Sequence, residues 1–287
     1  MEKSQSPMPT IPSPTATLFN ATLPTFRTPT DDIYNRLLPA ILLQEDHHLQ
    51  NLRPDYTPTP EEQTLIHRAA ILRTAYEQIP ALDLVLTPTG FGIVSNQQTA
   101  PASPARVSAL REQVRRSATL AEDTLLQHFL HSAPTALLDP ASHCPSLIYS
   151  PTIAQAFGIQ TPDGRTIYHE EFPRVIPTIH EAQARLSDLI SPELLTALIR
   201  HQYQADTDTT TDRLQVLDLL LYHARHLIAA LCQREAPTSI QLLQRHLLSA
   251  LRANAALLPE YTNSRTYLAQ TSTPYANQRQ DPSFFFS

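Results

Sequence analysis

The 287-residue sequence contains no tryptophan, four glycines, two cysteines and a single lysine, Lys3, and each scarcity argues against a class of protein. So few glycines argue against glycine-rich cofactor loops and against a β-rich chain with many tight turns. Cys144 and Cys232 could pair only by coincidence of the fold, and their spacing suggests no metal site. Nearly all positive charge is arginine, which we attribute to codon bias, although arginine also suits interface ion pairs.

Long apolar runs and recognisable catalytic motifs are also absent. No run approaches the roughly 20 residues that span a bilayer, and residues 1–30 lack the cationic and apolar regions of a signal peptide. The sequence has no P-loop, dinucleotide fingerprint or Gly-x-Ser-x-Gly elbow. We therefore expect a protein outside the membrane that is not an enzyme, with no catalytic residue, cofactor or metal.

The net charge of −6 gives no reason to expect broad affinity for nucleic acids, because there is no overall excess of cations to displace counterions. We therefore expect no sequence-specific nucleic-acid binding. Whether DNA passes close by is left open by the sequence.

Proline is abundant, with 26 residues, and several prolines mark helix starts. Thr59-Pro60-Glu61-Glu62 combines a capping hydroxyl, a proline at the first helical position and a glutamate three residues after the cap. Ser103-Pro104 and Ser191-Pro192 repeat the cap and the proline. These signals and helical periodicity predict helices over 61–79, 104–131, 212–234 and 238–258, with further helices opening near 33 and 172 and after Pro192.

Two short segments have the alternation and turn residues of β-hairpins, and together they hold all four glycines. The first covers 82–95 around Thr87-Pro88-Thr89-Gly90, and the second covers 157–168 around Thr161-Pro162-Asp163-Gly164.

The two halves of the chain resemble each other. A helix opening at Ile33 resembles one opening at Phe172, and each is followed by a largely apolar helix and a third helix with a hydroxyl or hydroxyl-proline start. We therefore expect a mostly α fold of two tandem three-helix units from an internal duplication, with one or two short hairpins and an extended arm at each end. The alternative is that any two helical bundles look alike. The expected divisions are an arm at 1–30, a first unit at 31–131, a connector with the second hairpin at 132–171, a second unit at 172–261 and a tail at 262–287.

The arms carry apolar residues that a plain linker would not need. We expect the arms and the first hairpin to bind partners, although the first arm could also be a tail with incidental apolar residues and the second could fold back on its own chain. The predicted partner-binding residues are Leu18, Phe19, Leu23, Phe26, Phe91, Ile93, Phe284, Phe285 and Phe286.

Histidines are the obvious place to look for chemistry. The pairs His128/His131 and His223/His226 stand three apart, a spacing that can present two imidazoles to a metal, but no glutamate or dense carboxylate cluster accompanies them. His169-Glu170-Glu171 places two carboxylates beside an imidazole, and we attribute it to the preference of acidic residues for helix starts.

Segment 79–107 is similar to an uncharacterised family of Bacteroidota phage and prophage proteins. The shared pattern is Ile79-Pro80-Ala81-Leu82 leading into a Leu-rich strand, then Gly90-Phe91-Gly92-Ile93-Val94-Ser95, then Ala100-Pro101-Ala102-Ser103 at a helix start. The weaker resemblance extends over 33–286, including the aromatic cluster at 284–286. The sequence departs from the family by its long first arm and by the lack of tryptophan between the units.

Members of that family lie among virion-structure genes, so the resemblance implies a head–tail connector or head-completion subunit. It implies a ring of copies of the chain, contacts with portal or tail proteins, and a location in the virion after assembly in the host cytoplasm. The alternatives are a cellular helical adaptor that binds one protein partner, and an enzyme whose histidines and carboxylates converge only in the fold.

Overall fold

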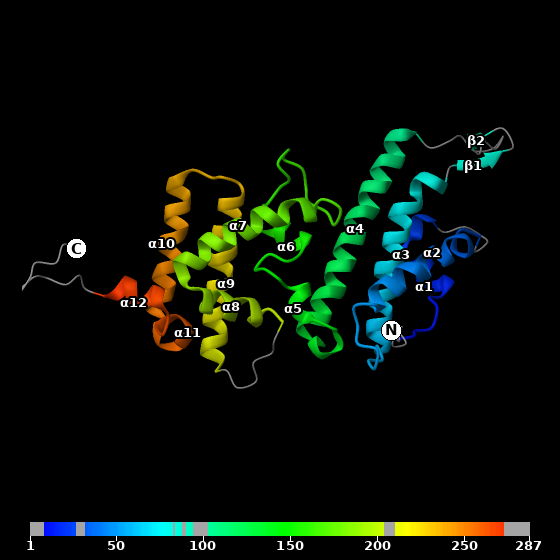
Figure 1. Ribbon diagram of the computed structural model, residues 1–287. Helices are drawn as coiled ribbons and strands as arrows, with labels where there is room; N and C mark the ends of the chain where they lie inside the picture. Colours follow the sequence, from blue (N-terminus) through cyan, green and yellow to red (C-terminus); the bar gives the residue numbers. More distant parts are fainter. Residues whose placement is uncertain are drawn as a thin grey trace, which may run out of the picture. The chain divides into compact units, whose positions relative to one another are not determined.

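A computed structural model describes residues 9–26, 32–82, 84–87, 90–93, 103–203 and 210–272 (Figure 1). The chain divides into two compact units. Unit 1 comprises residues 1–145 and 149–174, and unit 2 comprises 146–148 and 175–287. The described residues are mostly helical, so the predicted mostly α fold class is confirmed. No helix in the described ranges is long and apolar enough to cross a membrane.

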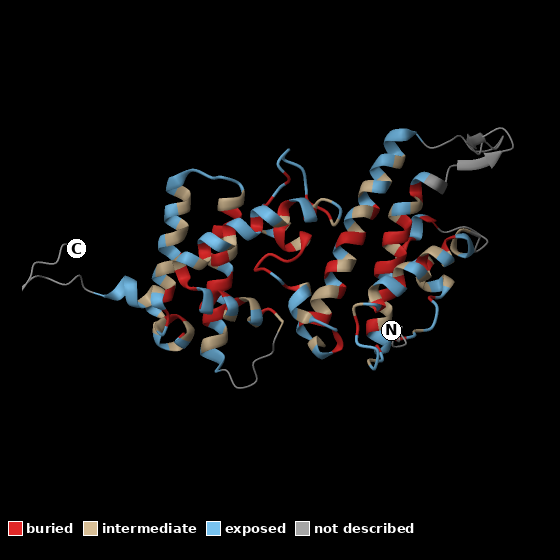
Figure 2. Cartoon of the chain, viewed as in Figure 1, coloured by how far each residue is buried: buried red, intermediate tan, exposed pale blue. Residues whose placement is uncertain are grey.

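Unit 1 is built around α3 and α4, which pack against each other, with α2 on α3 and α1 also on α3. Figure 2 shows buried residues along α3 and along one side of α4. The elements are α1 Ala16–Thr22, η1 Pro24–Phe26, α2 Asp32–Leu49, α3 Pro60–Leu82, β1 Leu84–Thr87, β2 Gly90–Ile93, α4 Pro104–His131, η2 Pro134–Ala136, α5 Pro140–His143 and α6 Pro151–Ala156.

The predicted helix starts are confirmed by their capping bonds. The backbone N–H of Thr59 donates to the Glu62 carboxylate at 2.7 Å, and the N–H of Glu62 donates to the Thr59 hydroxyl at 3.3 Å. This reciprocal pair satisfies two amides that a helix start leaves open. The Ser103 and Ser191 hydroxyls accept from the third residue after each cap.

The N-terminal segment folds onto its own unit. Phe19, Leu23 and Phe26 are buried with Ile41, Ile71 and other residues of α2, α3 and α4, and Leu18 is partly buried against the same cluster. The Tyr34 hydroxyl donates to the Pro14 carbonyl at 2.5 Å, which fixes the segment ahead of α1. The expectation of an extended arm whose apolar residues meet a partner is corrected here, because α2 and α3 offer those residues an apolar surface of their own chain.

The backbone of the first predicted hairpin pairs β1 with β2 antiparallel, Leu84 opposite Ile93 and Thr87 opposite Gly90. The second prediction was wrong: residues 157–168 contain no strand. Gly158 has φ +76° and ends α6, and the N–H of Ile159 donates to the Ala154 carbonyl at 2.9 Å. This bond is typical of a Schellman motif, which ends a helix. The Ile159 amide is therefore not available to a strand.

Unit 2 packs α9 against α10, with α8 and α11 beside them. Its elements are α7 Phe172–Ile190, whose first three residues count with unit 1, α8 Pro192–His201, α9 Thr211–Cys232, α10 Pro237–Ala253, η3 Ala255–Leu257, α11 Pro259–Thr262 and α12 Arg265–Thr271. Helix α9 buries nine of its 22 residues, but Leu219 and Tyr222 are 43% and 54% exposed, so its nearly continuous apolar sequence does not make it buried on all sides.

Two predicted divisions differ from the structure. The segment 132–171 was expected to be a connector, but apart from 146–148 it belongs to unit 1, because it buries apolar side chains such as Leu137, Ile153 and Ile167. Residues 146–148 belong to unit 2, where Arg225 donates to the Leu147 carbonyl at 2.9 Å. The tail was expected from 262, but helical structure continues to Thr271, with α12 capped by Ser264.

We predict that Phe19→Ala destabilises unit 1 by about 3 kcal/mol or more, because it removes a fully buried aromatic ring. Chemical denaturation, with hydrogen exchange of the α2 and α3 amides to isolate unit 1, measures the effect. Leu120→Ala, at a side chain 57% exposed, is the control and should change stability by less than about 0.5 kcal/mol. Equal effects of the two substitutions would contradict the burial of the N-terminal segment.

Candidate functional site

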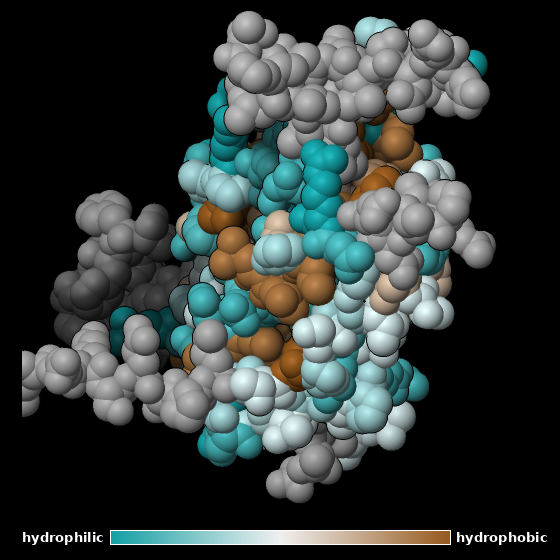
Figure 3. Space-filling model, turned by 90° about the vertical axis from the view of Figure 1, so that its right-hand side faces the viewer, coloured by the Kyte–Doolittle hydropathy of each residue, from teal (hydrophilic) through white to brown (hydrophobic). Residues whose placement is uncertain are grey.

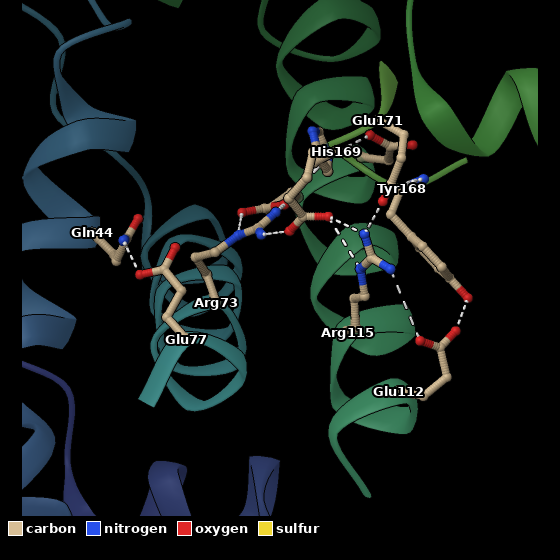
Figure 4. Close-up of polar contacts among 11 residues, drawn as sticks. Gln44, Arg73, Glu77, Glu112, Arg115, Tyr168, His169 and Glu171 are labelled. Carbon is tan, nitrogen blue, oxygen red and sulfur yellow. Dashed lines mark hydrogen bonds and ion pairs between the residues drawn. The ribbon is translucent and has the colours of Figure 1, made fainter. Parts of the chain in front are cut away.

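The largest polar network of the described residues lies in unit 1 around Arg73 of α3 (Figure 4). The Arg73 side chain is only 10% exposed, and two of its nitrogens donate to the Glu122 carboxylate of α4 at 2.7 and 2.5 Å. A third nitrogen donates to Glu170, 97 residues away in sequence. A buried guanidinium is tolerated only when its charge is paired in this way.

Arg115 extends the network along α4 (Figure 4). It donates to Glu170 at 2.9 Å and to Glu171 at 2.5 Å, and its guanidinium carbon lies 4.3 Å from the ring centre of Tyr168. The Tyr168 hydroxyl in turn donates to Glu112. The segment 168–171 is therefore held to α3 and α4 by charge-assisted bonds.

The ion pairs determine the charge of these groups. Burial opposes the charge of Arg73, but Glu122 and Glu170 outweigh it and raise the pKa of the guanidinium. Burial also opposes the charge of Glu170 and would raise its pKa. Hydrogen bonds from its own backbone N–H, Arg115 and Arg73 outweigh burial, and the pKa of Glu170 is lowered. The Glu170 carboxylate therefore stays ionised and paired with the two arginines at neutral pH.

A pocket of about 200 Å³ opens next to this network, within unit 1. Its lining contains apolar side chains as well as imidazoles, Asn51 and Glu122. The lining residues are His47, His48, Asn51, Leu52, Glu122, Leu125, Leu126, Phe129, Leu137, His143 and His169.

The pKa values of three pocket histidines, His48, His143 and His169, are shifted in different directions. Burial lowers the pKa of His48 to about 4, with Glu122 opposing the shift, and burial also lowers the pKa of His143. Both rings are therefore neutral at pH 7, and Nε2 of His48 is buried with no hydrogen-bond partner among the described residues.

His169 behaves in the opposite way. Burial disfavours its protonation, but Asp123 and Glu122 prevail and raise its pKa. Its Nε2 lies 3.1 Å from Oδ1 of Asp123 and 3.3 Å from Oε2 of Glu122. His169-Glu170-Glu171 directly precedes α7, as expected for a helix start, and all three side chains also form ion pairs across unit 1, which the sequence did not predict.

The lining of the pocket is poor in groups that form covalent intermediates. Its described lining includes no serine, threonine, cysteine or lysine that could act as a nucleophile. Glu122 is committed to Arg73, so it is a poor general base. Elsewhere, burial raises the pKa of the Cys232 thiol to about 11, which keeps it protonated and unreactive.

The histidine pairs singled out in the sequence do not line this pocket. His128 Nε2 lies 3.2 Å from Glu62, the capping glutamate of α3. The Tyr56 hydroxyl also donates to that carboxylate at 2.8 Å, and burial together with Glu62 raises the pKa of Tyr56 to about 12.

The second pair lies on α9 in unit 2. His223 contacts His246 of α10 with ring centres 6.4 Å apart, and His226 contacts Tyr222 at 4.5 Å. Burial, then His246 and His226, lowers the pKa of His223. Within the described ranges no group of three or more His, Cys, Asp or Glu residues is arranged to hold a metal ion.

The predicted partner-binding residues fall into two groups. Phe19, Leu23 and Phe26 are buried in unit 1 and Leu18 is half-buried, so the structure brings these four together in a core. The side chains of Phe91 and Ile93, and all of Phe284, Phe285 and Phe286, lie outside what the structure describes.

Residues 30–134 match the model of a family of unknown function (DUF6712). The match covers α2 to α4 with the paired strands between them, which is less than half of the chain. Neither the curated proteins nor the solved structures contain a match to the chain.

We predict that Arg73→Ala destabilises unit 1 by roughly 3 kcal/mol, since it leaves Glu122 buried without its partner. The matched control is Arg185→Ala, which removes an i, i+4 pair with Glu181 from a side chain 62% exposed and should cost less than about 0.5 kcal/mol. Urea denaturation of both variants measures the difference. Similar losses would show that the network around Arg73 contributes no more than a surface ion pair.

We predict that the free energy of unfolding decreases as the pH falls from about 6.5 to about 4, because folding keeps His48 neutral over this range. In this window the unfolded chain binds a proton on His48 and the folded chain does not, so the loss reaches up to roughly 3 kcal/mol. His169, whose pKa is raised, contributes in the opposite direction. The comparison is therefore between wild type and His48→Gln, which should lose stability less steeply over this range.

The free energy of unfolding at several pH values measures this dependence, with His180→Gln at an exposed position of α7 as the control. If His48→Gln and wild type follow the same pH profile, the burial of a neutral imidazole is contradicted.

Proposed function

We propose that the chain is a non-enzymatic structural subunit that associates with copies of itself and with other proteins of an assembly. The observation that carries this proposal is a hydrophobic patch on the face of unit 1 seen in Figure 3, on the side of α1 and α2. Helix α2 carries Leu43, which is 68% exposed, and Leu18, Ile33 and Tyr34 are partly buried against the core of unit 1. An exposed patch of this kind is typical of an interaction surface.

The polar residues of unit 1 support the same proposal. Arg73, Arg115, Glu122 and Glu170 pair with one another, so few charged groups remain to activate a substrate. The neutral imidazoles and apolar wall of the pocket favour an uncharged group over a reacting one. These features favour binding over the alternative of an enzyme with a fold-assembled site.

Among assemblies, we propose a phage head–tail connector or head-completion subunit, on the resemblance carried by residues 79–107. In this proposal copies pack in a ring and contact portal or tail proteins, in the host cytoplasm and then in the virion. Phe91 and Ile93 of the 82–95 hairpin and Phe284–Phe286 are the proposed contact residues. A cellular helical adaptor is the second candidate, and the same patch would then bind one partner protein.

We also propose that the units arose by duplication. Helices α2, α3 and α4 would correspond to α7, α9 and α10. In support, Pro39 lies inside α2 and Pro177 lies inside α7. Helix α8 has no counterpart in the first set.

We predict that Leu43→Asp weakens self-association roughly tenfold or more, because it places a charge in an apolar contact surface. Sedimentation velocity over a range of concentrations measures it, with the protein alone and mixed with a portal-type ring. Leu268→Asp in α12, at a leucine 58% exposed in unit 2, is the matched control. A wild-type protein that stays monomeric and does not bind the ring would contradict the connector proposal, and binding to one cellular protein alone would favour the adaptor.

A further inference from the structure

The pocket of unit 1 has the size of one aromatic ring. Its volume is about 200 Å³, and a cavity of about 150 Å³ lined by leucine, isoleucine and phenylalanine takes up benzene. The end of α2, the C-terminal part of α4 and the segment around Leu137 and His143 form its walls.

The lining combines polar side chains with apolar ones that can contact an aromatic ring: Leu52, Leu125, Leu126, Phe129 and Leu137. Among the polar groups, Nε2 of His48 is buried and the Glu122 carboxylate is paired with Arg73.

Phe129 already makes edge contacts that another ring could extend. Its ring centre lies 5.7 Å from that of His128 and 6.3 Å from that of Tyr56. Such edge-to-face contacts add to the free energy gained from burial alone.

The chain itself supplies a suitable ring. Its phenylalanines with described side chains are all buried or half-buried: Phe19, Phe26, Phe129, Phe157 and Phe172. Three more stand together at Phe284–Phe286, outside the described residues, and the sequence before them balances Arg279 against Asp281. A segment without net charge matches a pocket whose charges are paired.

We propose that a phenylalanine of the segment 284–286 from a second copy of the chain binds in this pocket. This inference rests on the proposed self-association and names one contact that would produce it. A short linear segment in a pocket of a neighbour adds affinity to a broader surface contact by raising the effective concentration of each.

The absence of tryptophan from the chain allows a direct test. The receptor is the full-length variant with Phe284, Phe285 and Phe286 replaced by Ser, which removes the competing segment. The probe is a peptide of residues 278–287 carrying Phe285→Trp, and its tryptophan emission should shift to the blue on binding. An unlabelled wild-type peptide should displace it, and a peptide with the three phenylalanines replaced by Ala should not.

Leu126→Glu in the receptor background should weaken peptide binding at least about tenfold, because it puts a charge into the wall of the pocket. Leu138→Glu is the matched control, since Leu138 is 57% exposed and does not line the pocket. If Leu126→Glu fails to fold by circular dichroism, His143→Glu, at a half-buried position of the same wall, takes its place.

The outcomes separate this inference from the proposed function. If the wild-type protein self-associates but the peptide does not bind, or binds equally to the Leu126→Glu and Leu138→Glu receptors, the pocket inference is overturned and self-association stands. If the peptide binds the receptor variant while the wild-type protein stays monomeric at all concentrations, the segment binds its own chain, which overturns the second copy as its source.

Discussion

The buried guanidinium of Arg73 is the constraint on which unit 1 depends. A cation that is 10% exposed must be paired, and its partners come from α4 and from the segment that leads into α7. Because Arg115 shares Glu170, the same carboxylate fixes α3, α4 and residues 168–171 at once. The position of His169 beside the pocket follows from where these charges are held, whereas burial keeps His48 neutral against the opposing effect of Glu122.

Local signals in the sequence predicted the helices well, because a cap acts over three or four residues. Thr59 with Glu62, Ser103 and Ser191 start helices where their patterns indicate. Ambiguous local signals failed: Phe157-Gly158-Ile159 fits a strand as well as a helix end, and the amide of Ile159 decides for the helix end. The pattern of glycine and apolar residues alone does not distinguish a strand from a helix end.

The candidate site could not be predicted, because its residues are far apart in the sequence. Arg73 and Glu170 are 97 residues apart, and the pocket draws on α2, α4 and residues 137–169. The pairs His128/His131 and His223/His226 attract attention by their spacing, whereas His48, His143 and His169 converge only after folding. The adjacent pair His47-His48 at the end of α2, and His169 beside two glutamates, were the available signals. The burial of the N-terminal phenylalanines could not be predicted either. Apolar residues in a proline-rich segment give the same sequence pattern whether they contact a partner or their own chain.

Some buried positions of this structure need arginine and could not be filled by lysine. Arg73 donates to both oxygens of Glu122 and also to Glu170, and Arg225 of α9 donates both to the Leu147 carbonyl and to Gln202. A lysine ammonium offers no planar set of donors for such divided contacts. Codon bias can enrich arginine, yet these positions need its geometry. Other arginines, such as Arg68, Arg174 and Arg245, are exposed, so the need for this geometry applies to the buried positions and not to every arginine of the chain.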